Sequence, residues 1–237
     1  MSESYSQSII SARPFWSMMS LVQSTGRYFS EGIFAEPYAA KTGAQIVYTN
    51  AICLAVYEDA RAEIGRRIFV PRPRNFRPPG FSRILKRENL VTVAENNDEV
   101  TINYTNGHNK PRSVQAAIPA SRISLPDWKD NIYEAEFAPI SALSEGTAKD
   151  QYGISAQSAK KISRACDGGI LQFTLLTKSG PAWGLISERH PIVGLVMAFL
   201  REDDEPPKGG FLNYDSFPKA PVSELPGIER RVRDLVA

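Results

Sequence analysis

Apolar residues recur at helical spacing in several parts of this sequence. A dense apolar group occupies positions 15–22, directly after a proline that suits the first turn of a helix. The segment 52–64 repeats an apolar residue every four positions and is followed by Gly65, a common residue just beyond a helix end. A third helix is predicted over 154–166. The preceding segment 45–49 fits either a strand or an earlier part of the second helix.

Alternation of apolar and polar residues predicts strands elsewhere. The segment 90–102 alternates on both sides of a turn rich in Asn and Asp, which is typical of a β-hairpin. A strand is expected over 114–118, and a second hairpin over 170–177 and 183–187. The segment 191–200 is apolar on every side, so it belongs to a core as either a central strand or a buried helix. No internal repeat is evident.

These elements predict an α+β protein, in which helices accompany short antiparallel sheets in two lobes. A polar, flexible N-terminus is expected over residues 1–13. A basic N-terminal lobe follows over 14–126 and contains a loop rich in Arg, Pro and Phe over 66–87. An acidic C-terminal lobe is expected over 127–237, with a solvated acidic linker at 202–210.

Composition narrows the class of protein further. Of the 237 residues, 42% are hydrophobic and 23% are charged, which is sufficient for a sizeable core. No apolar run approaches the roughly 20 residues that a membrane-crossing helix needs, so we expect no membrane partner. Cys53 and Cys166 lack a CxxC spacing, which favours a reducing, cytoplasmic location. His108 and His190 have no carboxylate or cysteine at ligand spacing, so we expect no metal and no cofactor.

Charge is concentrated in one stretch, residues 61–87. This stretch holds nine Lys and Arg residues and one acid, whereas the whole chain has a net charge of only +2. Prolines keep its backbone extended, and aromatic rings alternate with the cations. Guanidinium groups suit phosphates, and aromatic rings suit unstacked bases. The predicted nucleic-acid-binding residues are Arg66, Arg67, Arg72, Arg74, Phe76, Arg77, Phe81, Arg83, Lys86 and Arg87.

The favoured function is therefore non-enzymatic binding of single-stranded nucleic acid or RNA, within a larger complex that includes other protein subunits. A structural alternative is that the acidic lobe of the same chain neutralises these arginines. A further alternative is that the stretch is a protein interface, and that the chain is an assembly or adaptor subunit that acts through protein contacts alone. The third possibility is an enzyme with a metal-free site of dispersed carboxylates or arginines, because no catalytic signature is evident in the sequence.

Overall fold

The computed structural model divides the chain into two compact units. The first comprises Met1–Asn50 and Val56–Leu125, and the second comprises Ala51–Ala55 and Pro126–Ala237. The residues that the structure describes are 6–22, 31–38, 42–50, 52–73, 89–96, 98–105, 110–118, 129, 136–137, 152–166, 170–177, 180–187, 189–197, 199–200 and 211–212.

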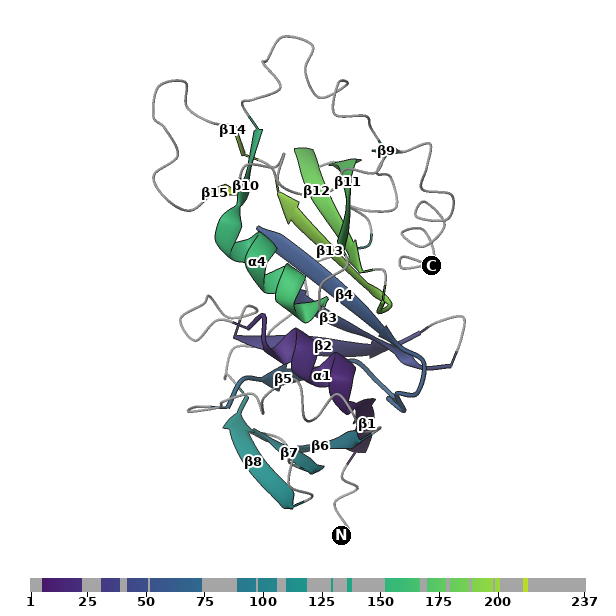
Figure 1. Cartoon of the computed structure of the whole chain (residues 1–237). Coiled ribbons are helices and arrows are strands. Elements are labelled where there is room, and N and C mark those ends of the chain that lie inside the picture. The colour runs from purple at the N-terminus through teal and green to yellow at the C-terminus, as the bar shows by residue number, and fades with distance from the viewer. Residues whose placement is uncertain are drawn as a thin grey trace. The chain divides into compact units, whose positions relative to one another are not determined.

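The protein is built mainly of β-strands. The described residues form fifteen strands and two helices (Figure 1). The expected α+β class, with helices accompanied by short sheets, is therefore wrong. In the described part of the chain, no helix is long and apolar enough to span a membrane.

The largest error concerns the helix predicted over 52–64. This segment instead contains strand β4, Cys53–Asp59. Residues on both faces of β4 are buried, since Ala55, Val56 and Tyr57 are all inaccessible. A strand covered on both faces loses its alternation of apolar and polar residues, so the apolar positions that remain can imitate a helical period.

Several local predictions are confirmed. Helix α1, Ala12–Met19, contains most of the first predicted helix. The hairpin predicted over 90–102 consists of β6, Leu90–Asn96, and β7, Glu99–Thr105, which pair antiparallel. The two segments that periodicity left undecided are strands, β3 at Ala44–Thr49 and β13 at Ile192–Met197.

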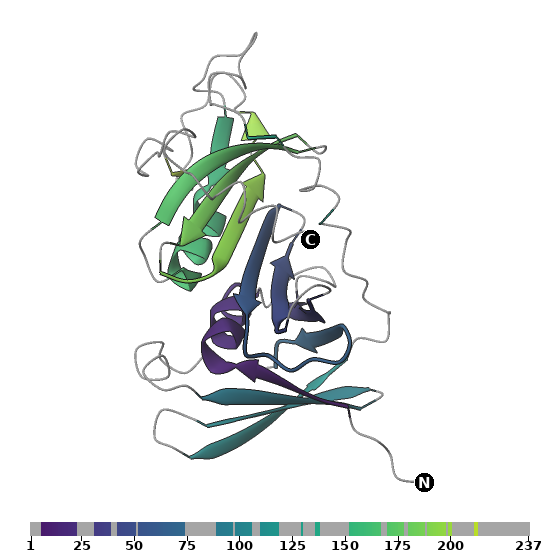
Figure 2. The same ribbon diagram turned by 90° about the vertical axis from the view of Figure 1, so that its right-hand side faces the viewer.

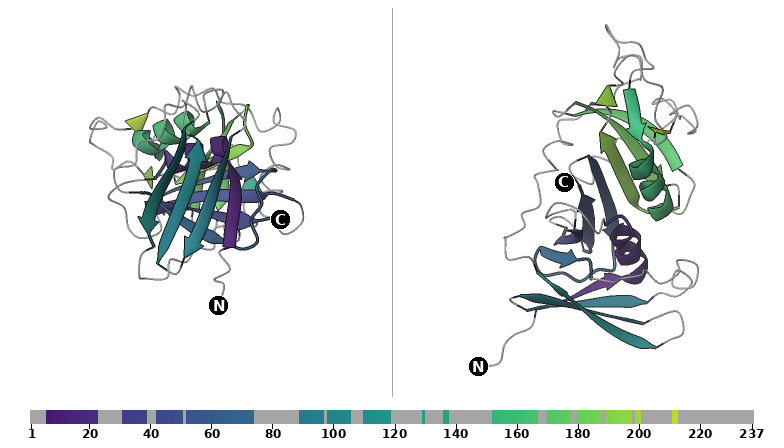
Figure 3. Two further views of the ribbon diagram at one scale, coloured as in Figure 1. Left: turned by 90° about the horizontal axis from the view of Figure 1, so that it is seen from below. Right: turned by 90° about the vertical axis from the view of Figure 1, so that its left-hand side faces the viewer.

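Along the chain, the strands of the first unit form two successive groups of four. The first strand of each group pairs in the sheet that the other group forms. The other strands are β1, Ser6–Ser11; β2, Gly32–Pro37; β5, Ile68–Pro71; and β8, Pro111–Ala117. One sheet has the order β1-β6-β7-β8, and β5-β2-β3-β4 are neighbours in the other. Strand β1 thus joins the sheet of the later group, and β5 joins the sheet of the earlier group (Figure 3). This repeated topology is absent from the sequence prediction.

Helix α1 packs against strands of both sheets of the first unit, β1 and β6 on one side and β2 and β3 on the other (Figure 2). Phe15 and Trp16 are buried, and the Trp16 ring meets the Tyr104 ring edge-on at 4.9 Å. Phe34 and Phe69 form a second ring contact at 4.9 Å between β2 and β5. Aromatic rings of this size dominate the burial of apolar area in such a core.

The second unit repeats the order strand, helix and three strands. Strand β10, Tyr152–Ser155, runs directly into α4, Ala156–Ala165. The following strands are β11, Ile170–Thr177; β12, Gly180–Ser187; and β13, with the order β13-β12-β11-β9. The remaining short strands are β9, Glu136–Phe137; β14, Phe199–Leu200; and β15, Phe211–Leu212. The tripeptide Ile-Ser-Ala stands at the strand-to-helix junction of both units, at 10–12 and 154–156.

Candidate interaction site

Two of the predicted nucleic-acid-binding arginines form ion pairs within the first unit. Arg66 Nη2 lies 2.8 Å from Glu95 Oε2 in β6. Arg67 contacts Glu36 of β2 through Nη2 at 2.6 Å and donates from Nε at 2.8 Å. The Glu36 side chain is only 5% exposed, whereas that of Arg67 is 55% exposed. Arg67 therefore neutralises a buried carboxylate.

A third arginine stabilises the backbone. The N–H of Arg72 donates to the Glu31 carbonyl at 2.8 Å, and its guanidinium donates from Nη1 to the Val22 carbonyl at 2.6 Å. As in the structural alternative, these arginines contact groups of their own chain. The carboxylates differ from those expected, because Glu36 and Glu95 belong to the first unit and not to the acidic second half of the chain.

The other predicted site residues lie outside the described part of the chain, so their role stays a prediction. They are Arg74, Phe76, Arg77, Phe81, Arg83, Lys86 and Arg87.

A buried carboxylate holds the junction between β1 and α1. Asp59, at the end of β4, is 4% exposed. Its Oδ2 accepts from the Ser11 N–H at 2.6 Å, and its Oδ1 accepts from the Ser11 hydroxyl at 2.8 Å. The N–H of Arg61 also donates to Oδ1, at 3.1 Å. Asp59 thus links the end of β4 to the edge strand of the other sheet.

The first sheet has two different edges. At the β1 edge, Ile9 and Glu63 exchange both backbone hydrogen bonds, each at 2.9 Å. Glu63 thus covers the middle of this edge. The opposite edge is β8, which appears at the margin of the sheet in Figure 3. Its pairing with β7 is uninterrupted from Pro111 to Ala117, so it contains no bulge.

One hydrogen bond shows which backbone groups of β8 point away from β7. The N–H of Ile118 donates to the Asp98 carbonyl at 2.8 Å, just beyond the ladder between β7 and β8. Backbone groups alternate in direction along a strand, so those of Ser113, Gln115 and Ala117 point away from β7. Among the described residues, no hydrogen bond uses these outward groups.

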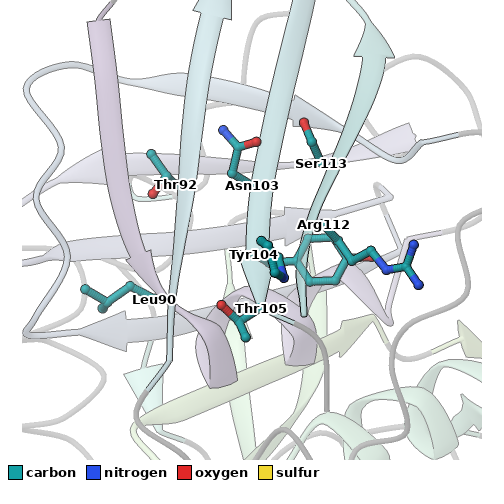
Figure 4. A pocket seen from close by; sticks show the side chains of 8 residues that line it. Leu90, Thr92, Asn103, Tyr104, Thr105, Arg112 and Ser113 are labelled. Carbon is teal, nitrogen blue, oxygen red and sulfur yellow. The ribbon is translucent and has the colours of Figure 1, made fainter. Parts of the chain in front are cut away.

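An open pocket of about 360 Å³ lies beside this edge (Figure 4). Thr92, Asn103 and Ser113 form a polar row across β6, β7 and β8, because Asn103 pairs with both of the others. Leu90, Thr105 and Pro111 extend the lining in the next row, and no acidic residue lines the pocket. Leu90 is 44% exposed, which is unusual for a large apolar side chain in this molecule. Arg112 also lines the pocket, which therefore offers hydrogen-bonding groups and one positive charge beside an apolar surface.

The two cysteines are poor candidates for nucleophiles. Burial raises the pKa of the Cys53 thiol to about 12, although Lys161 acts in the opposite direction. Burial likewise raises the pKa of the Cys166 thiol to about 12. Because the thiolate is the reactive form, both side chains are inert at neutral pH. The described residues also contain no group of three or more His, Cys, Asp or Glu side chains that could hold a metal ion.

We expect both thiols to resist a thiol reagent in the native protein and to react rapidly in denaturant. Each native thiol keeps its proton at a higher pH than the unfolded thiol, so native stability should fall as pH rises from about 9 towards 12. Labelling rates followed with and without urea test this expectation. Rapid labelling of the native protein would show that the cysteines are accessible.

Comparison with known proteins identifies a fold. No protein-family model and no curated protein matches the sequence. Among solved structures, the chain is similar to a sliding clamp, DNA polymerase III subunit beta, from Bartonella birtlesii bound to griselimycin. The TM-score is 0.50 at 10% identity, over 84% of this chain and 67% of the clamp. The Helicobacter pylori beta clamp bound to a DNA ligase peptide gives 0.48 at 9% identity, over 84% and 67%. The Thermotoga maritima beta subunit gives 0.45 at 8%, over 85% and 66%.

This likeness corrects the functional prediction. At such low identity it concerns the fold alone, and the fold is that of a sliding clamp. The prediction of a single-stranded nucleic-acid-binding or RNA-binding protein is therefore wrong as the main interpretation, and the assembly or adaptor alternative agrees better with the fold. The sequence did predict a strand at 114–118, which overlaps β8. It could not show that β8 is a sheet edge, because strand order depends on pairing between distant segments.

Proposed function

We propose that this chain is a non-catalytic scaffold that holds other proteins together at DNA. The observation that carries the proposal is the likeness to the Bartonella clamp over 84% of the chain. The exchanged strands of the first unit support it, because they join two groups of strands into one compact unit. An edge strand and the pocket beside it supply surfaces for partners.

Charge supports a position close to DNA. The first unit contains 15 Lys and Arg residues against 10 Asp and Glu residues, whereas the second contains 13 against 16. Positive charge attracts the phosphate backbone without reading sequence. The inferred role needs no base-specific contact, so it is compatible with arginines such as Arg66 and Arg67 that form internal ion pairs.

Affinity capture tests this function. The tagged full chain would be isolated from the cells that produce it, before and after nuclease digestion, with an unrelated tagged protein as the control. We expect enrichment of DNA-processing proteins, such as a polymerase or a ligase, that persists after digestion. Partners that disappear when RNA alone is digested would contradict the scaffold and support an RNA-mediated role.

A further inference from the structure

We propose that β8 is a docking edge for an extended, acidic segment of a partner protein, which adds to the sheet as a further antiparallel strand. This inference rests on the proposed scaffold function and specifies the chemistry of one partner. Addition of a strand to a sheet edge is a general mode of peptide recognition, in which backbone hydrogen bonds supply affinity and alternate side chains supply specificity.

The backbone of β8 carries hydrogen-bonding groups along its outer side. Three consecutive outward positions, Ser113, Gln115 and Ala117, each carry one N–H and one carbonyl that point away from β7. Sheet edges are commonly blocked by bulges, prolines, or a covering segment. In the described part of the chain, β8 has only Pro111, which is its first residue. The backbone groups from Ser113 onward therefore suit a pairing strand.

The charge at β8 is positive. Arg112 of β8 is exposed, and the exposed Lys110 lies directly before the strand. Strand β8 itself contains no acidic residue. Cross-strand neighbours on one face lie about 4.5–5.5 Å apart at Cβ, a distance at which opposite charges are stabilising. A carboxylate on the added strand opposite Arg112 fits this arrangement.

The face of β8 that carries Ser113 borders the pocket. Ser113 lies on β8 and also lines the pocket, together with Asn103 and Thr105 of β7 (Figure 4). Neighbouring strands lie about 4.8 Å apart. A large apolar side chain on the added strand would therefore lie beside Ser113 at the opening of the pocket. Residues of the segment should alternate between acidic and apolar.

A second copy of this chain is a weaker candidate for the occupant. Among the other described strands at sheet edges, β1 is bridged by Glu63, β5 has four residues, and β9, β14 and β15 have two each. A symmetric antiparallel pairing of β8 with β8 through Ser113, Gln115 and Ala117 would place Arg112 of each copy opposite Ile118 of the other, so neither strand would supply a carboxylate for Arg112. An acidic partner segment supplies the negative charge that a second copy of β8 lacks.

Titration of labelled synthetic peptides tests the proposal. One peptide alternates Glu and Val, a second alternates Lys and Val, and a third is the acidic peptide with N-methyl groups on alternate backbone nitrogens. We expect the acidic peptide to bind the full chain at least about tenfold more tightly than the basic one. N-methylation should abolish binding, because it removes the backbone donors of one strand edge.

Variants of the edge provide matched controls. Gln115→Pro should lose at least about tenfold in affinity, because the ring removes an outward donor, while Gln115→Thr should bind as the wild type does. Arg112→Glu should reverse the preference between acidic and basic peptides. Because Gln115 N–H is not used within the sheet, the melting temperature of Gln115→Pro should stay close to that of the wild type.

Three results would overturn the proposal: equal binding of both charges, no effect of Gln115→Pro, or no binding of the acidic peptide. Sedimentation velocity could give a fourth result that overturns the proposal. Self-association of the wild type that is lost in Gln115→Pro would assign the edge to a second copy. Peptide binding by the purified chain is measured independently of the capture experiment. Failure of the docking edge is therefore distinguishable from failure of the scaffold function.

Discussion

Replacement of Asp59 by alanine is expected to lower the free energy of unfolding by about 3–5 kcal/mol. The carboxylate is 4% exposed and accepts from the Ser11 N–H, the Ser11 hydroxyl and the Arg61 N–H. Hydrogen bonds to a charged acceptor contribute about 1.5–3 kcal/mol each, and alanine would leave all three donors without this acceptor. Urea unfolding followed by tryptophan fluorescence measures the change.

Two further variants make the Asp59 measurement specific. Asp59→Asn retains one acceptor oxygen, so its loss of stability should be intermediate. Glu63→Ala, four residues away, removes an exposed side chain and leaves the backbone bridge to Ile9 intact. Its effect should stay within about 0.5 kcal/mol. A small effect of Asp59→Ala would show that the β1–α1 junction does not depend on this carboxylate.

Loss of the Arg67 side chain should destabilise the protein by about 1–3 kcal/mol, although half of that side chain is exposed. Its partner Glu36 is buried, and removal of the guanidinium leaves that carboxylate poorly compensated. Arg66→Ala is the matched control. Its partner Glu95 is 21% exposed, so the variant should change stability by less than about 1 kcal/mol.

A double-mutant cycle isolates the interaction of Arg67 with Glu36. Glu36→Gln removes the charge but keeps a similar volume, so Arg67→Ala should cost little in that background. Equal losses in both backgrounds, or equal losses for Arg66→Ala and Arg67→Ala, would show that the buried ion pair does not determine the effect.

Local pattern predicted many elements correctly, and the failures have a common physical cause. The hairpin of β6 and β7 is half-buried, so its apolar and polar residues alternate and are readable. Strands β3 and β4 are buried on both faces, and periodicity cannot distinguish such strands from helices. The α+β prediction follows from that one ambiguity, because it converts a central strand into a helix.

The candidate site was less predictable than the fold. Arginine enrichment is visible in the sequence, but the partners of Arg66 and Arg67 are 29 and 31 residues away, in strands whose pairing the sequence does not encode locally. The same holds for the open edge at β8, because it depends on which strand lies last in the sheet. The useful local signal was the absence of acidic residues from β8.

Fluorescence anisotropy of single-stranded RNA over a salt series tests the central claim most directly. A protein that neutralises several phosphates shows affinity that falls steeply with salt. The scaffold account predicts that single-stranded RNA binds no more tightly than duplex DNA in the same assay, and that Arg67→Ala binds both as the wild type does once the variant is shown to be folded. Single-stranded RNA binding that is tighter than duplex DNA binding and is weakened in Arg67→Ala would contradict the account and restore the arginine stretch as the functional site.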